Sequence, residues 1–316
     1  MVYRRIFRSA WTLPVLASAA LSAALVVSAA TPALAAARGP HAVGDGSSSP
    51  EYYLALGDSL SVGVQPAPQT GTSEPTDQGY ADDLAAHYNS AFAGGLTLVK
   101  MGCSGETAAS MLTGTGSSCT YSGGSQLAAA LAFISAHRSN IALITIDIGA
   151  NDVDNCAAGG TISLSCIASG VAAIQSDLPK ILSAIHSAAG NGPVIAGMDL
   201  YDPFLQDYLT GPAGQQVAWE SAGLAVALNS MLAINYRLYG AQLADVAGTF
   251  STTDFLGTTQ LAGTGTVPLN VARICQWTWM CAASPLGPNI HANAAGYQQI
   301  ATAFETAIGN LSAASP

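Results

Sequence analysis

Charged side chains are scarce in this chain of 316 residues, and basic side chains are the scarcest. Lys and Arg together number 9 against 19 Asp and Glu, which gives a formal net charge of −10. Proteins that bind nucleic acids carry clustered Lys and Arg, and attraction to anionic membranes needs them as well. The composition therefore argues against a nucleic-acid partner and against adhesion to a membrane by charge.

The six cysteines show no Cys-x-x-Cys spacing, and the histidines lie elsewhere in the chain, so a zinc site is disfavoured. Many pairings of six cysteines are possible in principle. We expect disulfides between cysteines that are close along the chain, because exported proteins mature in an oxidising compartment. The expected pairs are Cys103 with Cys119, Cys156 with Cys166, and Cys275 with Cys281.

One apolar run is long enough to cross a membrane, and it lies at the N-terminus between Ala10 and Ala30. Arg4, Arg5 and Arg8 precede it, and the small residues Ala33-Leu34-Ala35 follow it as a cleavage site. This order is typical of a removable export signal, with a weak hint of the twin-arginine route. We expect residues 1–35 to be cleaved and residues 36–50 to form a flexible lead-in. No other membrane anchor is expected, so the mature protein is predicted to be secreted.

Residues 51–312 contain no linker, repeat or change in composition, so they are predicted to form one domain. Short apolar runs alternate with segments that have helical periodicity, an order that predicts a parallel sheet covered by helices on both faces. The expected fold is a three-layer α/β/α sandwich with about five strands. The predicted strands are 52–56, 96–101, 141–148, 193–198 and 242–246, and the predicted helices are 79–88, 127–137, 167–188, 213–238 and 293–308.

The first predicted strand ends abruptly in Gly57-Asp58-Ser59-Leu60. A serine at the carboxyl end of a parallel strand, followed by a helix start, has its hydroxyl beside unpaired backbone N–H groups. Such a serine can act as a nucleophile next to an anion-binding site. The alternative is that Asp58 and Ser59 only cap a helix, and these four residues alone do not decide between the two.

Polar residues also follow the second and third predicted strands and precede the last helix. They are Gly102 within Lys100–Thr107, Gly149-Ala150-Asn151-Asp152, and His291 within Pro288–Asn293. The ends of parallel strands meet at one edge of the sheet, so the first two of these segments are expected to lie near Ser59.

These four blocks, in this order, resemble the SGNH (GDSL) hydrolases, a superfamily of esterases, lipases and carbohydrate deacetylases. The resemblance extends over the whole mature domain and implies a flavodoxin-like α/β/α fold. The paired cysteines and the sequence Cys-Ser-Gly-Glu-Thr after Gly102 are most similar to the secreted actinobacterial esterase and lipase branch.

The resemblance also implies roles for four residues. Ser59 would attack the acyl carbonyl, and His291 would accept its proton as general base and later donate it to the leaving alcohol. The backbone N–H groups of Ser59 and Gly102 and the side-chain amide of Asn151 would form the oxyanion hole. No metal or cofactor is expected.

The chain departs from the family pattern at the residue that orients the histidine. The family usually has an Asp three residues before the histidine, and this chain has Pro288 there, with Asn289 as the nearest polar neighbour. We expect a Ser–His dyad oriented by a backbone carbonyl such as that of Pro288. Asn289, or a remote carboxylate such as Asp254, is the alternative.

The sequence thus predicts a secreted, monomeric serine esterase or lipase that hydrolyses small-molecule or lipid esters of carboxylic acids. A carbohydrate O-acetyl esterase, an acyltransferase and a catalytically silent domain that binds glycan or lipid remain alternatives. Trp277 and Trp279 could line an acyl site or belong to the core, and the insertion Pro66–Gln78 is expected to shape the cleft.

Overall fold

The fold is given by a computed structural model that describes residues 50–158 and 161–311. The predicted export signal (1–35) and all but the last residue of the predicted lead-in (36–50) lie outside the described residues.

The centre of the domain is a parallel five-stranded sheet. Its strands are β1 (Glu51–Gly57), β4 (Leu96–Lys100), β5 (Ile141–Asp147), β8 (Val194–Met198) and β9 (Gln242–Ala244), in the spatial order β4-β1-β5-β8-β9. The order reverses between β1 and β5, so the loops after these two strands diverge to opposite sides and leave a crevice, as in flavodoxin-like folds. The predicted fold class and all five predicted strands are confirmed.

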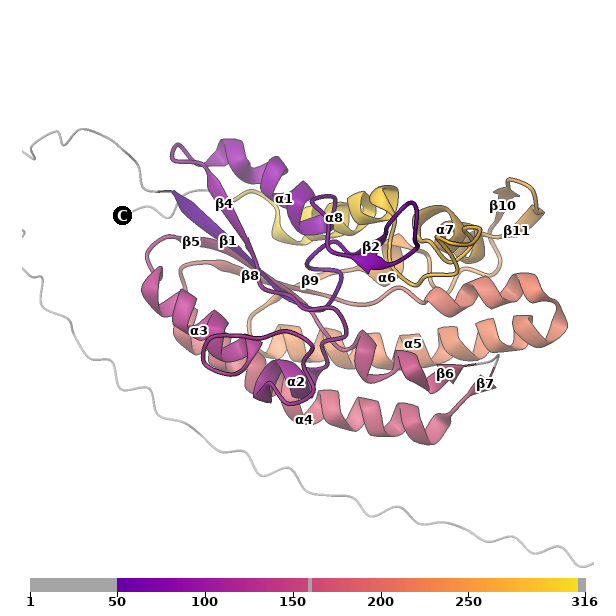
Figure 1. The fold of residues 1–316 in the computed structure, drawn as a ribbon, viewed down its shortest axis with the longest axis horizontal. Coiled ribbons are helices and arrows are strands. Elements are labelled where there is room, and N and C mark those ends of the chain that lie inside the picture. Colours follow the sequence, from indigo (N-terminus) through magenta and orange to yellow (C-terminus); the bar gives the residue numbers. More distant parts are fainter. Residues whose placement is uncertain (1–49, 159–160, 312–316) are drawn as a thin grey trace, which may run out of the picture. The chain divides into compact units, whose positions relative to one another are not determined.

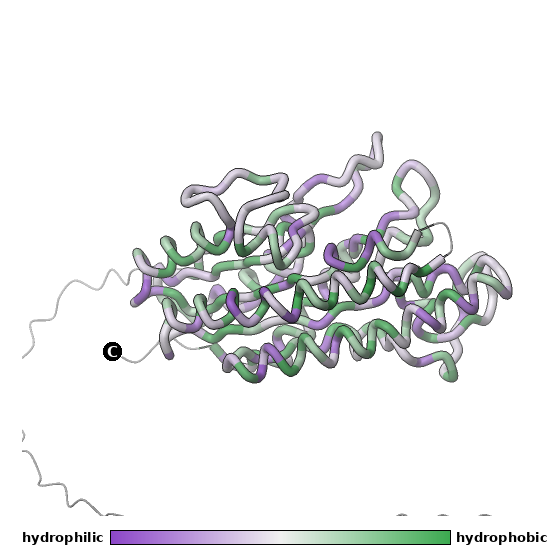
Figure 2. The backbone as a smooth tube through the Cα atoms, turned by 90° about the horizontal axis from the view of Figure 1, so that it is seen from below, coloured by the Kyte–Doolittle hydropathy of each residue, from purple (hydrophilic) through white to green (hydrophobic). Residues whose placement is uncertain are grey.

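Helices cover both faces of the sheet (Figure 1). The helices α1 (Tyr80–Tyr88) and α8 (Ala294–Ile308) pack together on one face. The other face is covered by α2 (Ala108–Thr113), α3 (Gln126–Ala136), α4 (Leu164–Ala189) and α5 (Pro212–Leu238). Hydrophobic and hydrophilic residues alternate along the helices in Figure 2, as expected where one side of a helix faces a sheet.

Helix α4 illustrates how the sequence sets these elements. Its buried residues include Ile174, Leu178, Ile181 and Ile185, which recur at the helical period and face the sheet. The helix begins three residues before its predicted start because the side chain of Ser163 accepts a hydrogen bond from the N–H of Cys166 and caps it.

Helix α5 is by length and composition apolar enough to cross a membrane, although no such segment was expected after residue 30. Val217, Leu228, Leu232 and Tyr236 of this helix are buried, and the helix contacts β8 and β9. One side of the helix therefore belongs to the core. Trp219, Val226, Ile234 and Leu238 of the same helix are exposed, and only 44% of its most apolar window is buried.

Two-residue strands and single helical turns have too few residues to show a period, so they were not predicted. Together with the nine-residue helix Leu269–Trp277, whose length does not explain its omission, these are the elements missing from the prediction. They comprise three two-stranded ribbons, β2 (Gln65–Pro66) with β3 (Ser73–Glu74), β6 (Ala157–Ala158) with β7 (Thr161–Ile162), and β10 (Thr258–Leu261) with β11 (Gly265–Pro268). The helices α6 (Val246–Thr249) and α7 (Leu269–Trp277) and the 3₁₀ turns η1 (Asn89–Ala91), η2 (Ala150–Asp152), η3 (Asp154–Cys156) and η4 (Pro203–Thr210) complete the set.

Three disulfides join Cys103 to Cys119, Cys156 to Cys166, and Cys275 to Cys281, the pairs expected from sequential pairing. Each closes a loop near the carboxyl edge of the sheet or beside the segment that carries His291. In the chain-entropy account a disulfide stabilises mainly by restricting the unfolded chain.

Candidate active site

Ser59 lies in the tight turn that follows β1 and is buried, with 6% of its surface exposed. The turn depends on Gly57, whose φ of +131° is strained for other residues and whose added Cβ would overlap Asp147. The Gln126 side chain at the start of α3 accepts from the N–H of Gly57 (2.7 Å) and donates to its carbonyl (2.9 Å). The end of β1 is therefore held from both sides of its backbone.

Asp58 organises this turn. Its Oδ1 accepts a hydrogen bond from the N–H of Leu60 (2.9 Å), and its Oδ2 accepts one from the amide of Asn151 (3.3 Å). Burial raises the pKa of Asp58 to about 7. Burial, and then the charge of Asp58, raises the pKa of the adjacent Asp147 as well. Asp58 thus ties the segment after β1 to the segment after β5.

His291 is carried by the loop between α7 and α8, and this loop is fixed by several backbone contacts. The N–H of Trp279 donates to the carbonyl of His291 (3.0 Å), and Thr278 and Ala292 form an isolated antiparallel bridge. The hydroxyl of Tyr201 donates to the carbonyl of Ile290 (2.7 Å). These contacts hold the loop against the segment that follows β8.

The imidazole of His291 contacts Asn289. Nδ1 of the ring lies 2.7 Å from Oδ1 of Asn289, and the same oxygen accepts the backbone N–H of His291 (3.0 Å). Because a backbone N–H can only donate, the Asn289 atom it meets is the oxygen, and Nδ1 must then carry the ring proton. Nε2 is left with its lone pair free, as a general base requires. Burial lowers the pKa of His291 to about 4, so the ring is neutral at neutral pH.

Of the candidate groups that could orient His291, Asn289 is the one that contacts the ring in the part of the chain that the structure describes. No hydrogen bond joins the ring to the carbonyl of Pro288 among the described residues. Asp254 is engaged elsewhere, because its Oδ1 accepts from the N–H groups of Leu256 (3.1 Å) and Gly257 (2.7 Å). The amide of Asn289 in turn donates to Oγ of Ser73 on β3 (3.0 Å), so the β2–β3 ribbon supports the residue that meets the imidazole.

Two of the three expected oxyanion donors are free. The N–H groups of Ser59 and Gly102 donate no hydrogen bond to the described residues, whereas the neighbouring Met101 and Cys103 donate to Ala55 (2.9 Å) and Gly57 (3.2 Å). The third, the side-chain amide of Asn151, donates to the carbonyl of Glu106 (3.0 Å) as well as to Asp58. These two bonds fix the position of the amide. To contact a substrate oxygen as well, the amide would have to share one of its N–H donors.

Gly102 is required where the loop after β4 approaches the turn that carries Ser59. An added Cβ would overlap Oγ of Ser61 and approach the carbonyl of Asp58 at 2.6 Å. Ser61 donates to that carbonyl (2.8 Å). The missing side chain thus lets the loop after β4 pack against the turn that carries Ser59.

Ser59, Asn151 and His291 line a common cavity of about 300 Å³. This volume is at the lower end of the range for ligand sites. The cavity extends from the ends of β1, β5 and β8 between α4 and α5. Its walls are mainly apolar, including Ile162, Ile167, Val171, Leu200, Phe204, Leu224, Leu228 and Met231.

Sequence reasoning missed most residues of this cavity. The segment Leu200-Tyr201-Asp202-Pro203-Phe204 lines it, and the available signal was its place after the fourth strand, at the edge that also carries Ser59. Asp154 also lines the cavity, whereas the carboxylate of the nearby Asp152 accepts the N–H of Ala108 at the start of α2 (3.0 Å). Trp277 and Trp279 do not line the cavity, and Trp277 packs on Phe250 and Arg273.

The sequence profile of the GDSL-like Lipase/Acylhydrolase family matches residues 55–299. No curated protein matches the chain significantly. Among solved structures, the extracellular lipase of Streptomyces rimosus is 20% identical, with a TM-score of 0.51, over 81% of this chain and 99% of its own. Phospholipase A1 of Streptomyces albidoflavus is also 20% identical, with a TM-score of 0.50, over 82% of this chain and 100% of its own. At this identity the two structures show a common fold.

Proposed function

Because this chain belongs to the GDSL-like lipase/acylhydrolase family, we propose that it hydrolyses carboxylic esters through an acyl-enzyme formed on Ser59. The observation that carries the proposal is that Ser59 and His291, which are 232 positions apart in sequence, line the same cavity. Their place in one cavity supports the roles of nucleophile and general base that we propose for them.

In the first half of the reaction, Nε2 of His291 takes the proton of the Ser59 hydroxyl while Oγ bonds to the acyl carbon. The negative charge that develops on the carbonyl oxygen is met by the N–H groups of Ser59 and Gly102 and by the amide of Asn151. When the bond to the alcohol oxygen breaks, His291 gives its proton to that oxygen. Water then repeats the sequence on the acyl-enzyme and releases the acid.

Asn289 supports these steps by holding Nδ1–H of His291, which keeps Nε2 unprotonated. It adds no negative charge, so the imidazolium that forms during the reaction is stabilised less than it is beside a carboxylate.

The cavity favours alkyl acyl chains over acetyl groups, because apolar side chains from α4, α5 and the loops after β1, β5 and β8 form most of its wall. We therefore propose an esterase or lipase of medium-chain esters rather than a carbohydrate deacetylase. We also propose that it acts outside the cell, since three disulfides are stable in an oxidising compartment and the first 35 residues have the pattern of an export signal.

The test compares the mature protein with Ser59→Ala, His291→Ala and the control Ser104→Ala, a change of an exposed serine two residues after Gly102. Hydrolysis of p-nitrophenyl acetate, octanoate and palmitate and of acetylated xylan is measured. We expect octanoate to be cleaved fastest and the first two variants to lose at least about 10³-fold in kcat, while the control keeps its activity. Acetate and xylan turnover alone would indicate a deacetylase, and an inactive protein that binds glycan or lipid would reject the proposal.

A further inference from the structure

Two carboxyl groups line the apolar cavity in addition to Asp58. Asp202 follows β8 and is 4% exposed; its Oδ1 accepts the N–H of Phe204 (2.9 Å), and its Oδ2 has no hydrogen-bond partner among the described residues. Asp154 begins η3, and its carboxyl group forms no hydrogen bond with the part of the chain that the structure describes. The hydroxyl of Ser221, which also lines the cavity, donates to the carbonyl of Ala218 (3.1 Å) and also interacts with the carboxyl group of Asp202.

No basic side chain balances these carboxyl groups within the cavity. Among the described residues that line it, none is Lys or Arg, and the only possible cation is His291, which burial keeps neutral. Burial, followed by the charges of Asp58 and Asp202, raises the pKa of Asp154 to about 8, and burial raises that of Asp202 to about 6. Asp154 and Asp202 line the same cavity, together with Asp58.

A carboxylate that is buried without a partner is costly, and a donor that enters the cavity recovers part of that cost. An ammonium group recovers more than a hydroxyl group, since it donates hydrogen bonds and also offsets negative charge. At pH 8, where Asp58 and Asp202 are mainly ionised and Asp154 is partly ionised, an anionic group would be repelled by these carboxylates. The alkyl walls on α4 and α5 would pack against the hydrocarbon part of the same ligand.

From this arrangement we propose that Asp154 and Asp202 form an acceptor pair that binds an alkylammonium group of the substrate and so select cationic esters over anionic ones. This inference rests on the proposed function only in calling the bound molecule a substrate. The binding itself depends only on the cavity.

The experiment measures binding to the Ser59→Ala protein by calorimetry at pH 8, with n-hexylammonium, n-hexanol and hexanoate as probes of one chain length. We expect n-hexylammonium to bind at least tenfold more tightly than n-hexanol, and hexanoate to bind at least tenfold more weakly than n-hexanol. Asp154→Asn and Asp202→Asn, added singly, should each weaken n-hexylammonium about tenfold and change n-hexanol less than threefold.

The matched control is Asp77→Asn, which removes the same charge at a side chain that is 99% exposed and does not line the cavity, and it should leave all three affinities within twofold. Unchanged n-hexanol binding shows that the cavity of each variant is intact. Equal affinity for n-hexylammonium and n-hexanol, or no loss in the two Asn variants, would overturn the inference while ester hydrolysis by the wild-type protein could still stand. Conversely, an ammonium preference in a protein that cleaves no ester would refute only the proposed function.

Discussion

At the scale of single residues, the contact between Nδ1 of His291 and Oδ1 of Asn289 is the one that most affects catalysis by the proposed mechanism. It is 2.7 Å long, and Asn289 is itself held by Ser73 at 3.0 Å. An amide can fix the orientation and tautomer of an imidazole as a carboxylate does, but it cannot offset the charge of the imidazolium.

Replacing Asn289 with Ala should therefore lower kcat by about 10- to 100-fold, because the ring loses the acceptor that fixes its tautomer. Ser73→Ala should lower kcat less than about threefold, since Oδ1 keeps its bond from the backbone N–H of His291. Steady-state kinetics with p-nitrophenyl octanoate measure kcat of the two variants and of the wild-type protein. If Asn289→Ala loses no more than Ser73→Ala, a group other than Asn289 orients the ring.

Asn289→Asp tests the charge separately from the geometry. A carboxylate beside Nδ1 favours the protonated ring, so the pKa of His291 should rise from about 4 toward its ordinary value. The acidic limb of kcat/KM against pH should move upward by at least about one unit, because the base must be deprotonated in the free enzyme. A limb that stays in place would show that another group controls the acidic side of the profile.

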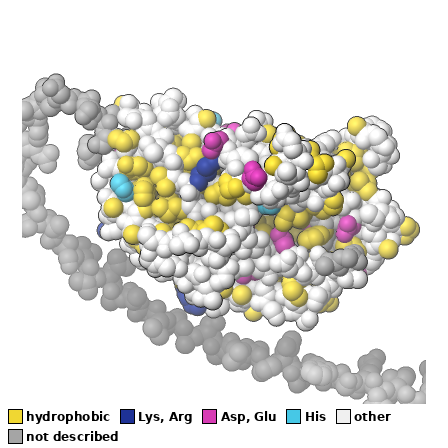
Figure 3. All heavy atoms as spheres, in the orientation of Figure 1, with side chains coloured by type: hydrophobic (Ala, Val, Ile, Leu, Met, Phe, Trp, Pro, Cys, Tyr) yellow, Lys and Arg dark blue, Asp and Glu magenta, His cyan; other side chains and the backbone are white. Residues whose placement is uncertain are grey.

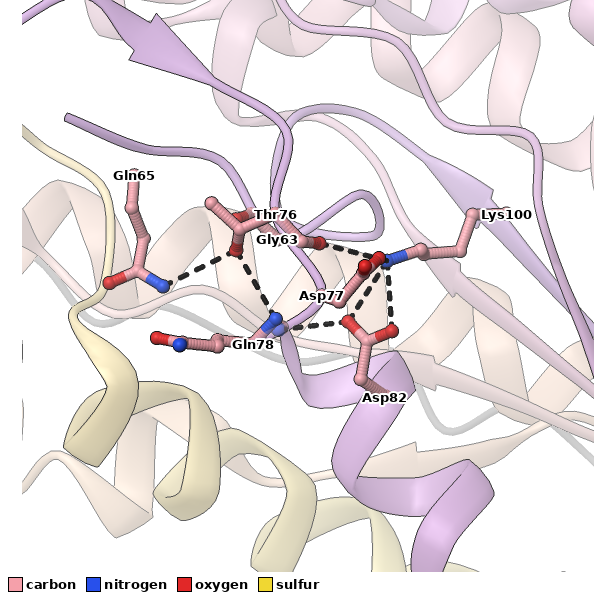
Figure 4. Close-up of polar contacts among 8 residues, drawn as sticks. Gly63, Gln65, Thr76, Asp77, Gln78, Asp82 and Lys100 are labelled. Atoms are coloured by element: carbon pink, nitrogen blue, oxygen red, sulfur yellow. Dashed lines mark hydrogen bonds and ion pairs between the residues drawn. The ribbon is translucent and has the colours of Figure 1, made fainter. Parts of the chain in front are cut away.

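At the scale of elements, Lys100 joins the segment that follows the β2–β3 ribbon to the sheet and to α1. Nζ of Lys100, at the end of β4, contacts the carbonyl of Thr76 (2.9 Å) and both carboxylate oxygens of Asp82 on α1 (2.9 and 3.0 Å) (Figure 4). Thr76 also donates to the carbonyl of Gly63 (2.6 Å). The segment that follows the ribbon is thus held by a partly buried ion pair and by hydrogen bonds from Thr76 to the carbonyls of Val62 and Gly63.

Lys100→Met should destabilise the protein by about 1–3 kcal/mol, because it leaves the Asp82 carboxylate without its partner while keeping the alkyl chain. The expected fall in Tm is about 5 °C for a domain of this size. Asp77→Asn is the matched control: its contact with Lys100 is 3.3 Å long and its side chain is 99% exposed, so Tm should stay within about 1 °C. Equal effects of the two substitutions in a thermal melt would contradict this account.

The five strands and the long helices could be predicted because each carries a continuous apolar run or a helical period, as in α4. The cavity walls could not be predicted, because Ile167 on α4 and Leu224 on α5 meet only when the two helices pack together. The contact of Ser73 with Asn289 likewise spans 216 positions and leaves no local signal.

The site shows the same limit. Ser59, Asn151 and His291 lie in short segments whose residue types are unusual at a strand end, so their patterns could be read. Asp202 lies in no such pattern. It became a candidate binding residue because one of its carboxylate oxygens has no hydrogen-bond partner among the described residues, which only the packed structure shows. The group that orients His291 could not be chosen from sequence because Pro288 and Asn289 are adjacent, and only the loop geometry distinguishes them.

At the scale of the whole molecule, the shortage of basic residues leaves buried carboxyl groups without cations. Figure 3 shows few Lys and Arg side chains on the face drawn. Burial raises the pKa of Asp58 to about 7, of Asp154 to about 8, and of Asp152, Asp199 and Asp202 to about 6. The folded protein therefore holds protons that the unfolded chain releases at about pH 4.

This difference predicts that the protein loses stability as the pH rises. Between about pH 4 and 8 the folded chain binds more of these carboxyl protons than the unfolded chain, so the free energy of unfolding decreases with pH. His291 acts in the opposite direction, because its folded pKa of about 4 lies below its ordinary 6.5, but it is one group against five. Calorimetry should show Tm falling by about 5 °C or more between pH 4.5 and 8. Asp58→Asn should reduce that fall, because an amide resembles the protonated acid, and a Tm that instead rises over this range would mean that the buried carboxyl groups are ionised and paired in the folded state.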